Sequence, residues 1–319
     1  MLIKNCILVD NDKTLLNICG VNDVILKKIE NICDCKIYYQ GNEIYYESKN
    51  PELIEKLIKS LITISQNNST ITENLIEILY NEIKNDNTSD IVGLLSTNIE
   101  IVKSKKIFKP KTINQGIYLK LLKEKDIIFS SGPAGTGKTF IAIIFAMNEL
   151  LSKRTKKVIL TRPVVEAGES LGFLPGDFIQ KINPYLVPLF SSINYILTPE
   201  VHAKLMEQNL IEIAPLAYMR GRTFSDSIVI LDEAQNTTYN QMKLFLTRPG
   251  ENVKMIITGD LTQIDLPNYK KSGMLQSIKI LKSIDEIGFI EFNDNDVIRH
   301  PLVKKILSAY NKYENSKHN

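Results

Sequence analysis

The hydrophobic pattern of this chain changes near residue 126. Before that point, apolar residues recur at helical spacing in three segments that we expect to be amphipathic helices: residues 23–32, 51–64 and 72–84. Residues 36–46 are typical of two short strands joined by a tight turn at Gly41. These elements predict a small N-terminal α/β domain over residues 1–84.

After residue 126, short apolar runs rich in β-branched residues alternate with helical segments. Residues 138–153 form the longest helical segment. Such alternation is typical of a parallel sheet that is covered by helices on both faces. We therefore predict an α/β core in a domain over residues 111–319, with a linker over residues 85–110. The expected strands number about five, near residues 126–132, 156–163, 227–235, 253–260 and 287–292.

Charge is distributed unevenly along the 319 residues, although the net charge is only +3. Residues 1–100 contain nine lysines and no arginine against fifteen acidic residues. Residues 101–125 contain eight lysines against one glutamate. The basic stretch is either a solvated face or a patch that binds polyanions such as RNA.

The N-terminus and the cysteines indicate where the protein works. The apolar stretch at the N-terminus is too short for a signal peptide, and no segment has the length of a membrane span. All four cysteines lie within the first 35 residues, without partners at the spacing of a zinc site. We expect reduced thiols in a cytoplasmic protein with no membrane association.

A glycine-rich loop carries the main chemical signal. Residues 132–139 read GPAGTGKT and follow a predicted strand, and a predicted helix begins at their end. This is the P-loop pattern, in which backbone N–H groups cradle phosphates at a helix N-terminus. Lys138 is expected to contact the β- and γ-phosphates, and Thr139 to bind Mg²⁺. We expect ATP to be held by Gly132, Pro133, Ala134, Gly135, Thr136, Gly137, Lys138 and Thr139.

An acidic pair follows the third strand of the predicted core. Asp232 is expected at the carboxyl end of that strand, where it can hold Mg²⁺ through water. Glu233 can polarise a water molecule for attack on the γ-phosphate. A metabolite kinase must exclude water and has no use for such a group, so the pair favours hydrolysis.

Polar residues also follow the fourth strand, and arginines follow several strands. Gln263 is a candidate to sense the γ-phosphate or orient the water, although its segment also suits a turn with helix-capping residues. Hydrolysis generally needs a further positive group at the γ-phosphate. The candidates lie near strand ends or in loops: Arg162, Arg220, Arg222, Arg248 and Arg299.

Several long motifs resemble one family of P-loop proteins. Residues 161–177 (TRPVVEAGESLGFLPGD) and 211–248, together with ITGDLTQIDLP and VIRHPLVKKI, are similar to the PhoH-like ATPases. The resemblance covers roughly residues 108–314. It implies a RecA-like ATPase core that acts in RNA metabolism, with an endoribonuclease of ribosomal RNA maturation as a possible partner. It also implies that Gln115 reads the adenine edge.

The same resemblance extends to the N-terminal region, which is similar to a KH-like domain. Residues Gly20–Asp23 correspond to the GxxG loop with which KH domains grip nucleic acid. Asp23 replaces the second glycine and places negative charge where phosphate would lie. Contact with protein and packing are therefore the alternatives to RNA binding for this domain.

These observations lead us to consider two functions and to expect one oligomeric form. The first function is an ATPase that remodels or unwinds RNA, and the alternative is a nucleotide-gated switch for a partner nuclease. Because the chain has room for one RecA-like core, its γ-phosphate would be open on one side. We therefore expect a ring or other head-to-tail oligomer, with a hexamer as the expected form, because heterologous contacts close into rings when the rotation allows. Arg299 is the first candidate for a catalytic arginine donated to the neighbouring subunit, and Arg248 is the second.

Overall fold

The computed structural model describes residues 3–66, 71–84, 92–95, 97–102, 106–163, 189–266 and 272–298. Its contacts divide the chain into two compact units, and each is described by itself. The first contains residues 1–100 and 107–120, and the second contains residues 101–106 and 121–319. The basic stretch 101–125 therefore contributes to both units.

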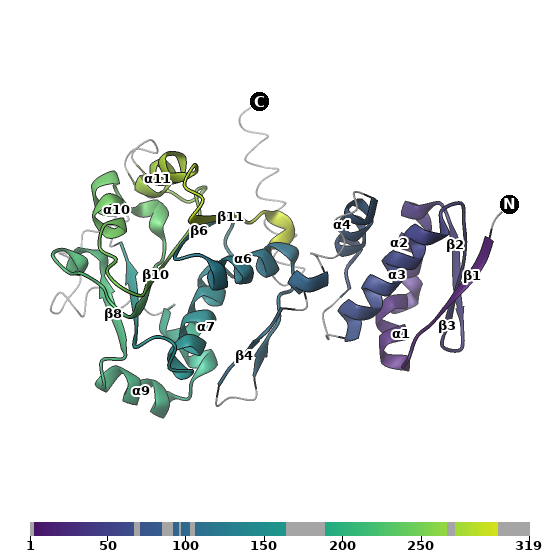
Figure 1. The fold of residues 1–319 in the computed structure, drawn as a ribbon, viewed down its shortest axis with the longest axis horizontal. Helices are drawn as coiled ribbons and strands as arrows, with labels where there is room; N and C mark the ends of the chain where they lie inside the picture. Colours follow the sequence, from purple (N-terminus) through teal and green to yellow (C-terminus); the bar gives the residue numbers. More distant parts are fainter. Residues whose placement is uncertain are drawn as a thin grey trace. The chain divides into compact units, whose positions relative to one another are not determined.

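The first unit is built on a three-stranded antiparallel sheet in the order β1-β3-β2. Helices α1, α2 and α3 lie on one face of this sheet, and α4 packs on α2 and α3 (Figure 1). The expected helices and hairpin are confirmed, while β1 and α1 are additional elements. The bounds are β1 (Ile3–Leu8), α1 (Asp12–Cys19), α2 (Val24–Cys33), β2 (Lys36–Gln40), β3 (Glu43–Ser48), α3 (Pro51–Gln66) and α4 (Glu73–Lys84).

Alternation of side chains along β3 explains how this unit forms its core. Ile44 and Tyr46 are buried beneath the helices, while the residues between them are only partly buried. Helix α3 contributes an apolar stripe that includes Leu57 and Leu61. The segment Gly20–Asp23, which resembles a GxxG loop in the sequence, lies between α1 and α2. A short pair, β4 (Ile99–Glu100) with β5 (Ile107–Phe108), precedes α6 (Ile113–Glu124).

The second unit contains a six-stranded sheet in the order β11-β6-β10-β9-β7-β8, and every neighbouring pair is parallel. The predicted α/β class with a parallel sheet is confirmed. The five predicted strands are all present, and β8 is a sixth strand that was not predicted and that pairs with β7 at the edge of the sheet. The strands are β6 (Ile127–Ser131), β7 (Lys157–Arg162), β8 (Ile211–Pro215), β9 (Ser227–Leu231), β10 (Val253–Gly259) and β11 (Ile287–Glu291).

Helices pack on both faces of this sheet. Val229 and Leu231 of β9 share a buried cluster with Met242 and Phe245 of α10. The alternate residues of the strand point to the opposite face, where α7 contacts β7, β9 and β10. The helices are α7 (Lys138–Leu151), α9 (Pro199–Glu207), α10 (Tyr239–Leu246) and α11 (Gly273–Leu281). Among the residues described, no helix is long and apolar enough to cross a membrane.

The parallel arrangement determines where functional groups meet. Strands β6, β7, β9 and β10 are neighbours or near neighbours in the sheet, and their carboxyl ends lie at one edge. The glycine-rich loop follows β6, Arg162 ends β7, Asp232 follows β9 and Asp260 follows β10. In open parallel sheets this edge is where ligands bind.

Candidate nucleotide-binding site

The glycine-rich loop turns sharply between β6 and α7. Gly132, Gly135 and Gly137 have φ angles of 133°, 86° and 90°, a region that residues with a Cβ rarely adopt. At Gly132 a Cβ would also lie 2.4 Å from the carbonyl oxygen of Phe292. These glycines allow the loop to curve back over the first turn of α7, whose N–H groups and dipole favour anions.

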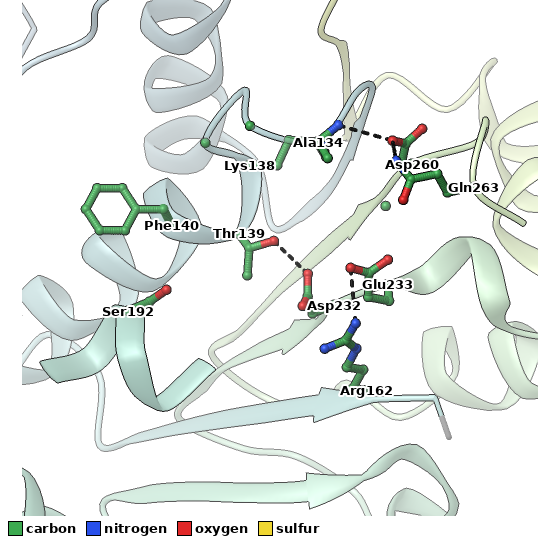
Figure 2. Close-up of a pocket in the computed structure, with 13 residues that line it drawn as sticks. Ala134, Lys138, Thr139, Phe140, Arg162, Ser192, Asp232, Glu233, Asp260 and Gln263 are labelled. Atoms are coloured by element: carbon green, nitrogen blue, oxygen red, sulfur yellow. Dashed lines mark hydrogen bonds and ion pairs between the residues drawn. The ribbon is translucent and has the colours of Figure 1, made fainter. Parts of the chain in front are cut away.

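The loop forms one wall of a pocket of about 320 Å³ (Figure 2). Residues from the ends of three strands, β7, β9 and β10, line most of the rest of it. They include most of the residues that the sequence singled out, with Phe140 and Ser192 in addition. The lining residues are Ala134, Gly135, Gly137, Lys138, Thr139, Phe140, Arg162, Ser192, Asp232, Glu233, Gly259, Asp260 and Gln263. Gly132, Pro133 and Thr136 complete the loop behind it, where Thr136 Oγ1 donates to the Pro133 carbonyl oxygen at 3.0 Å.

Lys138 is held inside the loop and is only 7% exposed. Its Nζ atom donates to the carbonyl oxygens of Gly132 and Pro133 at 2.6 and 2.8 Å. Burial lowers the pKa of the Lys138 ammonium group, and the nearby carboxylates of Asp260, Glu233 and Asp232 act in the opposite direction. The loop therefore presents a partly desolvated amine where a phosphate would be received.

Asp232 accepts two hydroxyl hydrogen bonds. Thr139 Oγ1 donates to its Oδ1 atom at 2.6 Å, and Thr258 Oγ1 donates to the same atom at 2.8 Å. The carboxylate is buried at the end of β9. Oxygen ligands of this kind suit Mg²⁺, which is usually held by one or two protein groups together with substrate phosphates. The Thr139–Asp232 pair thus fits a magnesium ion.

Glu233 lies beside this pair in an unusual backbone conformation. Its φ and ψ angles are 52° and 38°, in the left-handed region that costs free energy for a residue with a side chain. Arg162 Nη2 is 3.2 Å from Glu233 Oε1 (Figure 2). Gln235 Nε2 donates to Glu233 Oε2 at 2.6 Å. The carboxylate is therefore fixed from two sides, facing the pocket next to Asp232.

Asp260 connects the loop after β10 to the P-loop. Its Oδ2 atom accepts hydrogen bonds from the Ala134 backbone N–H at 3.1 Å and from Gln263 Nε2 at 3.0 Å. Thr262 caps the other carboxylate oxygen through both its N–H and its hydroxyl group. Gln263 is thus held at the pocket by Asp260.

Gln235 was not singled out from the sequence. Its side chain is only 1% exposed, and it donates to Glu233 and to the Gln263 carbonyl oxygen, the latter at 3.1 Å. Its Oε1 atom accepts the Asp260 backbone N–H at 3.0 Å. The amide therefore joins the loops after β9 and β10. Because these partners are distant in the chain, spacing alone gave no signal of this role.

The remaining predicted site residues are Gln115, Arg299 and Arg248. Gln115 belongs to the first unit, where it is buried and accepts the Lys111 backbone N–H at 2.8 Å. Its adenine-reading role stays a prediction. Arg299 lies outside the described residues, so its donated role is also untested. Arg248 donates through Nε to the Leu244 carbonyl oxygen at 3.1 Å, at the end of α10.

A phosphate-cradling loop that closes over a buried lysine, beside a Thr–Asp pair at the carboxyl edge of a parallel sheet, is the arrangement of P-loop NTPases. We assign the second unit to that class. Comparison with known proteins then gives the family. The family model described as PhoH-like protein matches residues 107–311, and the chain belongs to this family.

Relatives from several bacteria support this assignment. A PhoH-like protein of Bacillus subtilis is 44% identical over 304 residues, which cover 95% of each chain. A PhoH-like protein of Mycobacterium tuberculosis is 41% identical over 94% of this chain and 86% of that protein. Protein PhoH of Escherichia coli K12 is 44% identical over 60% of this chain and 55% of its own length.

Solved structures show more distant similarity. The Hef helicase domain of Pyrococcus furiosus matches with a TM-score of 0.36 and 17% identity, over 57% of this chain and 38% of that chain. The Pif1 helicase of Candida albicans matches with a TM-score of 0.30 and 15% identity, over 57% of this chain and 40% of its own.

Proposed function

We propose that this protein hydrolyses ATP with Mg²⁺ and uses the reaction to remodel or unwind RNA. The observation that carries the ATPase part is the convergence of Lys138, Thr139, Asp232 and Glu233 on one pocket. A binding module needs the first three groups, whereas only hydrolysis needs a carboxylate fixed beside them. The RNA part rests on family membership and on the exposed lysines of the basic stretch, which include Lys106, Lys111, Lys120 and Lys123.

Each residue has a separable role in this proposal. The loop N–H groups and Lys138 hold the phosphates and offset their charge. Thr139 and Asp232 hold Mg²⁺, which further neutralises charge on the phosphates. Glu233 accepts a proton as the water oxygen bonds to the γ-phosphorus. The bond from that phosphorus to the bridging oxygen then breaks, and ADP leaves with the electron pair.

Turnover with and without RNA tests this function. We expect single-stranded RNA to raise the rate of ATP hydrolysis by the full chain, and Glu233→Gln to stop turnover while nucleotide binding persists. Equal loss of binding and turnover in Glu233→Gln would mean that Glu233 has a structural role. If RNA has no effect and only an endoribonuclease stimulates turnover, the nucleotide-gated switch replaces the remodelling function.

We also propose that the protein works as a head-to-tail ring in the cytoplasm, with Arg299 reaching the neighbouring site. Lys138→Ala and Arg299→Ala chains, each inactive alone, should recover some activity when they assemble together, because some interfaces then contain both groups. A fully active monomer at saturating ATP would rule out this assembly as a requirement.

A further inference from the structure

One arginine of this chain already lies in the nucleotide pocket. Arg162 is the last residue of β7, its side chain is 20% exposed, and it lines the pocket together with Lys138 and Asp232. Figure 2 shows its guanidinium group directed at Glu233, on the opposite side of the Thr139–Asp232 pair from the P-loop lysine. This is a position from which a cation can reach a bound phosphate.

Two other arginines of the described ranges form ion pairs with residues that do not line the pocket. Arg222 forms a two-pronged ion pair with Glu212 of β8, at 2.5 and 2.9 Å. Arg154 pairs in the same way with Glu149 of α7, at 2.6 and 2.9 Å. None of the arginines in the described part of the chain, apart from Arg162, lines the pocket.

We propose that Arg162 contacts the terminal phosphate of the bound triphosphate, and that it leaves its ion pair with Glu233 to do so. This inference rests on the proposed ATPase function and assigns the phosphate-sensing cation to the same chain. Guanidinium groups bind phosphate oxygens with matched geometry. A terminal phosphate carries more negative charge than one carboxylate, so it competes for Arg162 when it enters the pocket.

The observed ion pair is suited to exchange. The Arg162 Nη2 to Glu233 Oε1 distance is 3.2 Å, longer than the roughly 2.7–2.9 Å of strong charge-assisted hydrogen bonds. Both side chains are partly exposed, at 20% and 35%, which weakens the pair through solvent screening. A phosphate with better geometry can therefore displace the carboxylate.

The exchange has a consequence for Glu233. When Arg162 moves to the phosphate, Glu233 Oε1 loses its ion-pair partner and can accept a proton from water. Gln235 still donates to Oε2 at 2.6 Å, and its own amide is anchored by the Asp260 N–H and the Gln263 carbonyl oxygen. The carboxylate thus keeps its orientation while its basic oxygen is released. Binding of the terminal phosphate thus also releases Glu233 to act as the base.

Binding measurements separate this role from general effects on the site. We would titrate the full chain with ADP and with a non-hydrolysable ATP analogue, both with Mg²⁺, in a calorimeter. Arg162→Ala should weaken analogue binding by about tenfold or more, as expected for loss of a hydrogen bond to a charged group, and leave ADP binding nearly unchanged. Arg162→Lys should retain part of the preference for the analogue. Arg222→Ala, which also removes one member of an Arg–Glu pair, should change neither affinity.

A double-mutant cycle tests the exchange itself. Glu233→Gln removes the competitor for Arg162, so it should tighten analogue binding a few-fold in the parent and have no such effect in Arg162→Ala. Equal weakening of ADP and analogue by Arg162→Ala, or the same effect of Glu233→Gln in both backgrounds, would overturn the inference. A parent chain that binds neither nucleotide would instead refute the proposed function.

Discussion

Two buried threonines near the ends of strands β7 and β10 allow a controlled test of the hydrogen bonds that Asp232 accepts. Thr258 and Thr161 are both fully buried, at the ends of β10 and β7. The Thr258 hydroxyl donates to Asp232 Oδ1 at 2.8 Å, whereas the Thr161 hydroxyl has no hydrogen-bond partner among the described residues. Substitution by valine removes either hydroxyl with almost no change in side-chain size.

The two substitutions should have different effects on stability. A hydrogen bond to a charged group contributes about 1.5–3 kcal/mol. Because Thr139 still donates to Asp232 at 2.6 Å, we expect the lower part of that range for Thr258→Val, about 1.5–2 kcal/mol off the free energy of unfolding. Thr161→Val removes a hydroxyl that is buried without a partner, so it should be neutral within about 0.5 kcal/mol or stabilising.

Urea unfolding measures this difference. The chain has no tryptophan, so far-UV circular dichroism is the suitable signal. The slopes of the free energy against urea should match the parent, so that shifts in midpoint report stability. Thr258→Val should also weaken the Mg²⁺ dependence of nucleotide binding, since Asp232 loses one of the two groups that orient it. Equal destabilisation by both substitutions would show that the bond to Asp232 is not the cause.

Three further predictions concern separate parts of the chain. Lys138→Ala should abolish ATP hydrolysis, because it removes the charge that stabilises the phosphates; a parental rate in a turnover assay would show that the site is misassigned. Changing the basic-stretch lysines 103, 105, 106 and 109 to glutamine should weaken RNA binding and flatten its salt dependence, measured by titration at several salt concentrations. Arg222 and Lys157 lower the pKa of Glu212 from 4.5 to about 2. The ionised Glu212 carboxylate therefore stabilises the fold above about pH 4.5, and this stabilisation is lost as the pH falls toward 2. Acid unfolding of Glu212→Gln should therefore depend less on pH over that interval, and a parental pH dependence would contradict the assignment.

The elements that the sequence predicted are those whose signals lie within a few consecutive residues. The P-loop and the Asp232–Glu233 pair are local motifs at strand ends, and the parallel sheet brings strand ends together by itself. Strand β8 was missed because its segment, IEIAP, is short and carries a charged residue. That residue, Glu212, is accommodated because β8 lies at the edge of the sheet, where Lys157 and Arg222 pair with it.

The contacts around Glu233 could not be predicted from spacing. Gln235 contacts Asp260 and Gln263, which are 25 and 28 residues away in the chain. Arg162 is 71 positions before Glu233, and the sequence argument ranked Arg299 and Arg248 ahead of it. Only the order β10-β9-β7 in the sheet brings their strand ends next to one another. These contacts are therefore determined by the order of the strands in the sheet and not by any local sequence pattern.

The position of Arg162 makes the source of the arginine at the γ-phosphate a separate question from whether the protein forms a ring. The sequence argument for a ring assumed that a single core lacks an arginine and must receive one from a neighbour. Because Arg162 lines the pocket of its own chain, the proposed contact of an arginine with the terminal phosphate needs no second copy, and Arg299 is then a candidate for an additional group. Mixing experiments distinguish the cases. Arg162→Ala and Lys138→Ala chains should fail to restore activity together, because both groups serve the same site and each site would lack one of them. Recovery in that mixture, to the level proposed for Arg299→Ala with Lys138→Ala, would show that Arg162 instead serves the neighbouring subunit.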